Sequence, residues 1–263
     1  MKIATWNVNS IRKRLDRVIP WLAEHQPDVL CVQETKVEDD SFPRAEIASA
    51  GYHVLCHGQK TYNGVALLTR EPATDAVRGF GDGAEDAQAR FLVATVGDVR
   101  VGTVYVPNGQ AVGSEKFAYK LAWLARWRDW LSAHADASTP LALCGDINIA
   151  PDDRDVYDPA AWKDQVLCTP AERAALAEVC RWGLADTFRQ HHQEAGLYSW
   201  WDYRQLGFPR DLGLRIDLIL CTPSLSARCT SITIDRDARK GKNPSDHAPV
   251  IAEFSSSPPR TNA

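Results

Sequence analysis

Residues 141–151 read LALCGDINIAP, an apolar run that turns polar and then reaches a proline. The run is typical of a buried strand, which Pro151 would end. Because side chains alternate between the faces of a strand, Asp146 and Asn148 are expected to point the same way. Gly145 would let the backbone approach a neighbouring group closely. A carboxylate beside an amide suits a metal ion with a bound water or phosphate, and a solvated loop is the alternative.

Similar apolar runs recur along the chain and predict about ten strands. Each is short, rich in Val, Ile and Leu, and bounded by Gly, Pro or Asp. The runs are 2–8, 28–34, 53–58, 64–69, 91–97, 99–106, 141–147, 215–221, 231–235 and 249–254. A Gly-Asp turn at residues 97–98 separates two of them and predicts a hairpin.

Three segments between these runs have helical patterns. Residues 11–25 place apolar side chains at helical spacing, and residues 114–134 do the same behind Ser114, an expected N-cap. Residues 169–172 read TPAE, a capping box with proline at the first helical position, and Gly183 should end that helix. Three tryptophans in the second helix, Trp123, Trp127 and Trp130, are expected to pack in the core.

Many strands, few helices and short turns do not predict a regular alternation of strand and helix. They predict an α/β fold in which two packed, mostly antiparallel sheets are flanked by helices. The 263 residues would allow one or two domains, but no linker-like break in composition is present. We therefore expect a single domain over residues 1–254 and a flexible tail over residues 255–263.

Bulk composition points to a cytoplasmic protein. No apolar run approaches the ~20 residues of a membrane span, and the N-terminus lacks the apolar region of a signal peptide. The seven cysteines have no CxxC spacing, and Cys31, Cys144 and Cys221 lie inside apolar runs. The net charge of −4 does not indicate a nucleic-acid partner. Two short basic segments, residues 12–17 and 236–242, are either solvated loops or contacts that flank a site.

Polar side chains also stand where several other runs end. They are Asn7, Asn9, Glu34, Tyr105, Asn108, Asp217, Asp246 and His247. Each has an ordinary structural explanation, such as a turn, a helix cap or a satisfied structural histidine. Asp217 lies within an apolar run, where an ionised carboxylate is costly unless it is paired, and Arg215 should share its face.

Taken together, these side chains predict a hard-cation site beside a His–Asp pair, which suits hydrolysis of a phosphodiester. Magnesium prefers oxygen ligands and can polarise a phosphoryl oxygen. Asp217 would hold the His247 ring and favour its protonated form, while Asn and Tyr donors would stabilise the transition state. No Ser or Cys nucleophile motif is present, so direct attack by water fits best.

Eight motifs resemble the bacterial exonuclease III family of apurinic/apyrimidinic endonucleases, and the resemblance spans residues 1–254. They are WNVNSIR (6–12), QETK (33–36), YNGVAL (62–67), YVPNG (105–109), GDINIAP (145–151), SWWDYR (199–204), GLRIDLIL (213–220) and PSDHAPV (244–250). GDxN and SDHxP alone would indicate only the wider endonuclease/exonuclease/phosphatase superfamily. WWDYR followed by GLRIDL is more specific to the DNA-repair branch.

The resemblance implies a four-layer α/β sandwich and cleavage that depends on Mg²⁺ or Mn²⁺. The expected reaction is hydrolysis 5′ to an abasic site in duplex DNA, which leaves a 3′-hydroxyl. Variable 3′→5′ exonuclease and 3′-phosphatase activities accompany it, so the expected partner is double-stranded DNA with abasic sites or blocked 3′ ends. We expect a monomer that does not bind membranes.

The resemblance also implies roles for individual residues. Around the metal it places Asn7, Glu34, Asp146, Asn148, Asp246 and His247, with Glu34 as the principal ligand. The catalytic positions are Tyr105, Asp146, Asn148, Asp217 and His247. Asp146 would orient or deprotonate the water, and His247 would act with Asp217 either as a base or as a phosphate-stabilising cation.

Substrate binding is expected at Asn108, which would contact phosphate, and in an apolar pocket. Trp200, Leu214 and Ile216 would line this pocket and accept a flipped sugar that has no base. Trp200 and Trp201 are adjacent in an expected strand and cannot both face inward. The basic segments then become candidate phosphate contacts on either side of the site.

Two other functions remain open from the sequence. One is a superfamily phosphatase or phosphodiesterase that acts on a non-DNA phosphate ester, such as a lipid or sugar phosphate. The other is a non-catalytic DNA-binding relative, which the intact acidic and histidine positions disfavour. The net acidity of the chain also argues against high exonuclease processivity.

Overall fold

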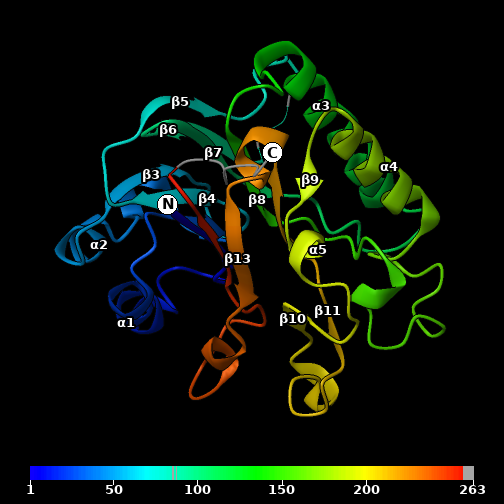
Figure 1. The fold of residues 1–263 in the computed structure, drawn as a ribbon. Helices are drawn as coiled ribbons and strands as arrows, with labels where there is room; N and C mark the ends of the chain where they lie inside the picture. The colour runs from blue at the N-terminus through cyan, green and yellow to red at the C-terminus, as the bar shows by residue number, and fades with distance from the viewer. Residues whose placement is uncertain (85, 87, 257–263) are drawn as a thin grey trace, which may run out of the picture.

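Two six-stranded sheets form the centre of the computed structural model, which describes residues 1–84, 86 and 88–256 (Figure 1). In spatial order, the first sheet contains β13 (Cys229–Ile234), β14 (Val250–Phe254), β1 (Lys2–Asn7), β2 (Val29–Gln33), β4 (Val65–Thr69) and β3 (His53–His57). The second contains β5 (Thr74–Arg78), β6 (Phe91–Val96), β7 (Val99–Tyr105), β8 (Leu141–Asp146), β12 (Asp217–Cys221) and β9 (Ala185–Asp186). A small ribbon pairs β10 (Trp200–Trp201) with β11 (Gly213–Leu214).

Helices cover the outer face of each sheet, so the expected four-layer α/β sandwich is confirmed (Figure 1). On the first sheet, α1 (Leu15–His25) and α2 (Arg44–Ser49) bury Trp21 and Ile47. On the second, α3 (Glu115–His134) and α4 (Pro170–Arg181) bury the three predicted core tryptophans. The short segments are α5 (Phe188–His191), α6 (Pro223–Ser226), η1 (Asp39–Ser41), η2 (Asp153–Asp155), η3 (Arg204–Leu206) and η4 (Arg236–Arg239).

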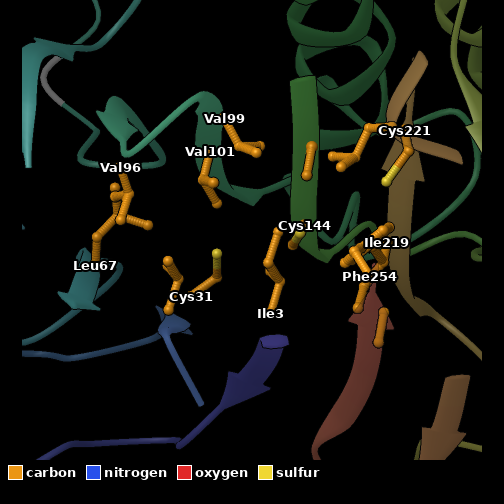
Figure 2. Packing of buried hydrophobic residues seen from close by; sticks show 14 of the residues in the cluster. Ile3, Cys31, Leu67, Val96, Val99, Val101, Cys144, Ile219, Cys221 and Phe254 are labelled. Carbon is orange, nitrogen blue, oxygen red and sulfur yellow. The ribbon is translucent and has the colours of Figure 1, made fainter. Parts of the chain in front are cut away.

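Apolar side chains from both sheets meet in one core between them (Figure 2). Ile3 and Cys31 of the first sheet pack in the same cluster as Val101, Cys144 and Cys221 of the second, as expected for free cysteines that act as small hydrophobes. This inter-sheet core fixes one sheet against the other.

All ten predicted runs contain a strand, and the predicted hairpin is present with Val96 opposite Val99. The strands that the pattern did not predict are β5, β9, β10 and β11. Four of the five side chains in β5 are exposed, so it shows no apolar alternation. The other three contain two residues each, which is too short for a periodic signal.

The predicted start of the first helix, at residue 11, is wrong. The helix begins at Leu15. Residues 11–14 form a turn instead, in which the N–H of Arg14 donates to the carbonyl of Ile11, and the N–H groups of Ser10 and Ile11 donate to the carbonyls of Glu34 and Thr35. The other two predicted starts are confirmed. Ser114 accepts from the N–H of Phe117, and Thr169 forms the capping box of α4.

The strand directions explain why polar residues gather at one edge. β1 and β2 are parallel, and so are β7 and β8, whereas the remaining neighbours in the two sheets are antiparallel. Parallel strands end at the same edge, so Asn7 lies beside Gln33, and Tyr105 beside Asp146. An antiparallel neighbour starts at that edge, which places Asp217 opposite Asp146.

The remainder of the chain adds two observations. Of the predicted tail, Ser255 exchanges hydrogen bonds with Arg228, and residues 257–263 lie outside the described residues. No helix in the described part of the chain combines the length and the apolar character needed to span a bilayer.

Candidate active site

Three acidic or basic side chains converge where the two sheets meet. Glu34, Asp146 and His247 each present a ligand atom, and these atoms lie within 4.8 Å of one another. Glu34 directly follows β2, Asp146 ends β8, and His247 precedes β14. Groups separated by more than two hundred residues therefore share one point, as expected from their positions at the strand termini.

Asn7 joins the two acids of this cluster. Its Nδ2 donates to Glu34 Oε1 at 2.8 Å and to Asp146 Oδ2 at 2.9 Å. Lys36 Nζ lies 2.8 Å from the other oxygen of Glu34 and 2.6 Å from Asn9 Oδ1. The ammonium group of Lys36 is thus in contact with oxygen atoms of this site.

His247 forms a buried pair with Asp217. His247 Nδ1 lies 2.9 Å from Asp217 Oδ2, and the hydroxyl of Ser199 donates to the same oxygen at 2.6 Å. Burial by itself lowers the pKa of His247, but the carboxylates of Asp217 and Asp146 raise it, to about 10. The imidazole is therefore protonated at neutral pH, and its Nε2 lies 3.7 Å from Asp146 Oδ2.

For Asp146, burial shifts the pKa in the opposite direction from its effect on His247. Burial raises the pKa of Asp146, the His247 charge lowers it, and the carboxylates of Asp217 and Glu34 raise it, so that the net value is about 7. A carboxyl group with a pKa near neutral pH can accept a proton during catalysis.

Asp246 precedes His247 in the chain and is held by two donors. Asn9 Nδ2 donates to Oδ1 at 3.0 Å, and Trp200 Nε1 donates to Oδ2 at 3.1 Å. Burial raises the pKa of Asp246, but the charge of His247 and these hydrogen bonds lower it by more. The net pKa lies below the ordinary value, so the carboxylate stays ionised.

Two amides and one phenol lie along the other side of the cluster. Asn108 Nδ2 donates to Asn148 Oδ1 at 3.0 Å, and Asn148 Nδ2 donates to the carbonyl of Val106 at 3.0 Å. Burial, Glu34 and Asp146 raise the pKa of Tyr105 well above its usual value, so the phenol keeps its proton. Arg90 lies over the Tyr105 ring at 4.5 Å. All three predicted donors therefore face the same region.

The predicted strand alternation of Asp146 and Asn148 is wrong. β8 ends at Asp146, and Asn148 has a left-handed φ of 52°. The N–H of Asn148 donates to Asp146 Oδ1 at 3.0 Å, so a side-chain turn and not a strand brings the two residues together.

The predicted apolar pocket residues share one cluster. Leu214 and Ile216 are 0% and 2% exposed, and the half-buried Trp200 packs against them. The neighbouring Trp201 is only 1% exposed and contacts Phe208, so the two tryptophans point to different environments as predicted.

Two predicted placements are wrong. Asp217 starts β12 and does not lie in its middle. Arg215 pairs not with Asp217 but with Asp155 at 2.6 Å and Asp186 at 2.7 Å, because the irregular backbone before β12 turns its side chain toward η2 and β9.

The two basic segments lie side by side and not on opposite sides of the site. Arg17 donates to the carbonyls of Ala238, Lys240 and Lys242 at 2.6–2.9 Å, which ties α1 to the loop after η4. Arg14 donates to the carbonyls of Asn9 and Pro244, so this joined surface borders the site.

Sequence reasoning missed several side chains that support the site. They are Ser199, Lys36, Arg90, Lys120 and Glu172. Ser199 and Lys36 lie inside two of the recognised motifs, SWWDYR and QETK, and this position was a usable signal. Lys120 looked like an ordinary polar position of an amphipathic helix, and Glu172 was recognised only as a cap.

The residues present suit a hard divalent cation. Glu34 and Asp146 supply carboxylate oxygen atoms within one cluster, and burial together with the neighbouring carboxylates raises the pKa of Asp146. A cation beside these oxygens would relieve their mutual repulsion, as the Lys36 ammonium already does for Glu34.

Oxygen ligands beside a His–Asp pair, where strands of two packed sheets end, define a phosphoesterase. A family model described as the endonuclease/exonuclease/phosphatase family matches residues 4–247, and the chain belongs to this family. The resemblance found in the sequence is therefore confirmed, and the chain is a hydrolase of phosphodiester bonds.

Known relatives cover nearly the whole chain. Exodeoxyribonuclease III of Haemophilus influenzae is 38% identical over 97% of this chain and 100% of its own length. The solved structure of an AP endonuclease from Archaeoglobus fulgidus is 41% identical, with a TM-score of 0.94 over 97% of this chain and 99% of that one. The 3′ phosphatase NExo from Neisseria, bound to a product DNA hairpin, is 43% identical with a TM-score of 0.93 over the same shares.

Proposed function

We propose that the protein is a DNA-repair phosphodiesterase that hydrolyses duplex DNA on the 5′ side of an abasic site and leaves a 3′-hydroxyl. Accompanying 3′→5′ exonuclease and 3′-phosphatase activities would act on blocked 3′ ends. The observation that carries this proposal is the convergence of Glu34, Asp146 and His247 within 4.8 Å. Two similar proteins of known structure, an AP endonuclease and a 3′ phosphatase bound to DNA, support the proposed substrate.

Glu34 is the proposed principal ligand of Mg²⁺, or of Mn²⁺, with Asn7, Asp146, Asn148, Asp246 and His247 around the same centre. When bound, the cation would polarise a phosphoryl oxygen and offset the charge on the leaving oxygen. Asn7 holds Glu34 and Asp146 together through its amide, so the carboxylates are oriented before substrate binds.

Asp146 is the proposed general base. Its pKa of about 7 lets it accept a proton from the attacking water at neutral pH. The N–H of Asn148 fixes one carboxylate oxygen and Asn7 fixes the other, so the base has a defined orientation.

His247 is the proposed phosphate-stabilising cation. With a pKa of about 10 it is protonated, which favours donation from Nε2 to a phosphoryl oxygen over a role as base. Asp217 holds the ring through Nδ1, and Ser199 fixes Asp217 in turn. Tyr105, Asn108 and Asn148 would add neutral donors to the same oxygens.

The abasic sugar would bind against the half-buried ring of Trp200, which packs on Leu214 and Ile216. A nucleotide without a base costs least to flip out of a duplex, and an apolar site would reject a polar base. Trp200 Nε1 is fixed by Asp246, so the ring that borders the sugar is tied directly to the cation side of the site.

Incision of an abasic duplex on a denaturing gel tests the proposal. We expect cleavage with Mg²⁺, none with EDTA, and a loss of about a hundredfold or more in Glu34→Ala. Glu38→Ala is the matched control, because Glu38 is exposed in the segment that follows. Persistent incision in EDTA would contradict metal-dependent hydrolysis. Hydrolysis of an inositol polyphosphate but not of the duplex would support the non-DNA alternative.

We further propose that residues 1–254 work as one domain, in a cytoplasmic monomer. β1 and β14, from opposite ends of this range, are neighbours in one sheet, and the inter-sheet core draws on both halves. The seven cysteines are free, and burial raises the pKa of Cys56, Cys144, Cys168, Cys180, Cys221 and Cys229, as suits a reducing compartment.

A further inference from the structure

A buried ion pair lies directly beneath the loops that contain Asn108 and Asn148. Lys120 of α3 and Glu172 of α4 are both 0% exposed, and Lys120 Nζ lies 2.5 Å from Glu172 Oε1. Removing two charges from water is costly, so a buried pair persists only where further hydrogen bonds satisfy it. The partners of this pair therefore show what it holds.

Lys120 uses its other donors on the backbone of the two loops. Its Nζ donates to the carbonyl of Asn148 at 2.6 Å and to that of Asn108 at 3.1 Å. An ammonium group has three N–H donors, and these two carbonyls together with Glu172 occupy all three. One cation thus fixes the main chain of both amide residues.

Glu172 is itself held rigidly. Its Oε2 accepts from the N–H and the hydroxyl of Thr169 in the capping box, and its Oε1 also accepts from the N–H of Leu167. The cap therefore anchors the carboxylate, and the carboxylate anchors Lys120. We call Lys120 and Glu172 the α3–α4 clamp.

The side chains above the clamp are aligned with each other. Asn108 donates to Asn148, and Asn148 donates to the carbonyl of Val106, with one N–H of each amide. An amide NH₂ has two hydrogens, so each residue has a second N–H to offer to a phosphoryl oxygen. Their direction depends on the backbone that Lys120 holds.

We propose that Lys120 and Glu172 are positioning residues, whose clamp holds the Asn108 and Asn148 amides in place to bind the reacting phosphate. Neither residue touches substrate. This inference rests on the proposed function, in which those amides donate to phosphate. Donors fixed in advance are most effective in the transition state, so loosening the clamp should lower kcat more than it raises KM.

The double variant Lys120→Met/Glu172→Gln tests the clamp. It removes both charges together, so no unpaired ion is left in the core. We expect kcat for abasic-site incision to fall about tenfold to a hundredfold with KM little changed. In an Asn108→Ala/Asn148→Ala background the same substitutions should have almost no further effect, because the groups they position are gone.

Amide hydrogen exchange gives a readout that needs no activity. In the clamp variant, the segments around Asn108 and Asn148 should exchange faster than in the wild type. Leu131→Ala is the matched control, since this buried residue lies eleven residues beyond Lys120, near the other end of α3. It should lower the melting temperature while kcat and loop exchange stay unchanged. If the double variant does not fold, Thr169→Ala, which removes one donor to Glu172 and keeps both charges, should give a smaller change in the same direction.

The outcomes separate the clamp from the proposed function. Unchanged loop exchange, or an unchanged kcat in a folded variant, would overturn the clamp. So would an equal loss of kcat in the amide-free background. A wild-type protein that does not incise the duplex would instead refute the proposed function, and loop exchange would still decide whether the clamp exists.

Discussion

Two residues of the site, Asp146 and His247, both have pKa values above their ordinary values, for different reasons. The pKa of Asp146 is raised to about 7 by burial and neighbouring carboxylates, and that of His247 to about 10 by Asp217 and Asp146 despite burial. If the base must be ionised and the imidazole protonated, activity lies between these two values.

The incision rate should therefore rise as pH passes through about 7 and fall as it passes through about 10. Asp217→Asn removes the largest influence that raises the pKa of His247. The fall in rate at high pH, the upper limb of the pH–rate profile, should therefore move to lower pH. A pH–rate profile of kcat/KM measures both limbs. Asp237→Asn, an exposed carboxylate, should leave them in place. An unmoved upper limb in Asp217→Asn would contradict the proposed role of His247.

The ionised carboxylate of Asp146 should also destabilise the fold, although the proposed catalysis needs it. Its folded-state pKa lies above the unfolded value of 3.8, so ionisation is disfavoured in the fold and the penalty is complete above about pH 7. Asp146→Asn should abolish incision in the presence of Mg²⁺, and in metal-free buffer it should raise the free energy of unfolding at pH 8.

The gain should stay below the ~4 kcal/mol that three pKa units represent, because His247 loses a nearby carboxylate. It should disappear as pH falls from about 7 toward 3.8, where the wild-type carboxyl is also neutral. Urea unfolding at pH 5 and pH 8 measures the difference. A variant less stable than wild type at pH 8 would show that Asp146 is held favourably as an anion.

At the level of elements, the parallel pair β7–β8 depends on a glycine. A Cβ on Gly145 would lie 1.8 Å from the carbonyl oxygen of Val104, a backbone atom that cannot move without breaking the ladder. The expectation that Gly145 permits a close approach is thus confirmed, and the group approached is the neighbouring strand.

Gly145→Ala should therefore lower the free energy of unfolding by more than about 3 kcal/mol or prevent folding. Gly102→Ala, in the partner strand, is the matched comparison. Its Cβ would meet the end of the Leu143 side chain at 2.6 Å, which can rotate away, so the loss should be smaller. Urea denaturation ranks the two, and equal losses would mean that side-chain packing and not backbone contact sets the cost.

For the whole molecule, the net charge of −4 means that binding to DNA must depend on local basic surface. The segments around α1 and η4 form one such surface, because Arg17 ties them together. Arg17 uses its guanidinium on carbonyls, so exposed lysines such as Lys13 and Lys242 are the better candidates for phosphate contacts.

Affinity for an abasic duplex should fall as the salt concentration rises. Each lysine that contacts phosphate adds about 0.9 to the steepness of the plot of log affinity against log salt concentration. Lys13→Ala/Lys242→Ala should weaken binding and reduce the slope by up to about 2. Lys2→Ala is the control, because Lys2 starts β1 at the opposite end from Asn7. Fluorescence anisotropy across salt concentrations measures the slopes. Equal slopes in all three proteins would exclude this surface from the DNA interface.

The sequence by itself determined the elements and the set of polar residues. Ten strands, two helix caps and the predicted hairpin follow from periodicity and from contacts a few residues apart, which the local sequence contains. The motifs also identified residues such as Glu34 and His247, because each stands at a strand terminus. The sequence predicts these features correctly because they depend little on residues far away in the chain.

Only the tertiary structure decided which groups face each other. The left-handed turn at Asn148, the pairing of Arg215 with Asp155, and the junction of the two basic segments all depend on segments far apart in the chain. The same is true of the Lys120–Glu172 pair, whose members looked like a surface residue and a cap. Burial and nearby charges set the pKa of Asp146, and both arise only when the two sheets pack face to face and bring their strand ends together.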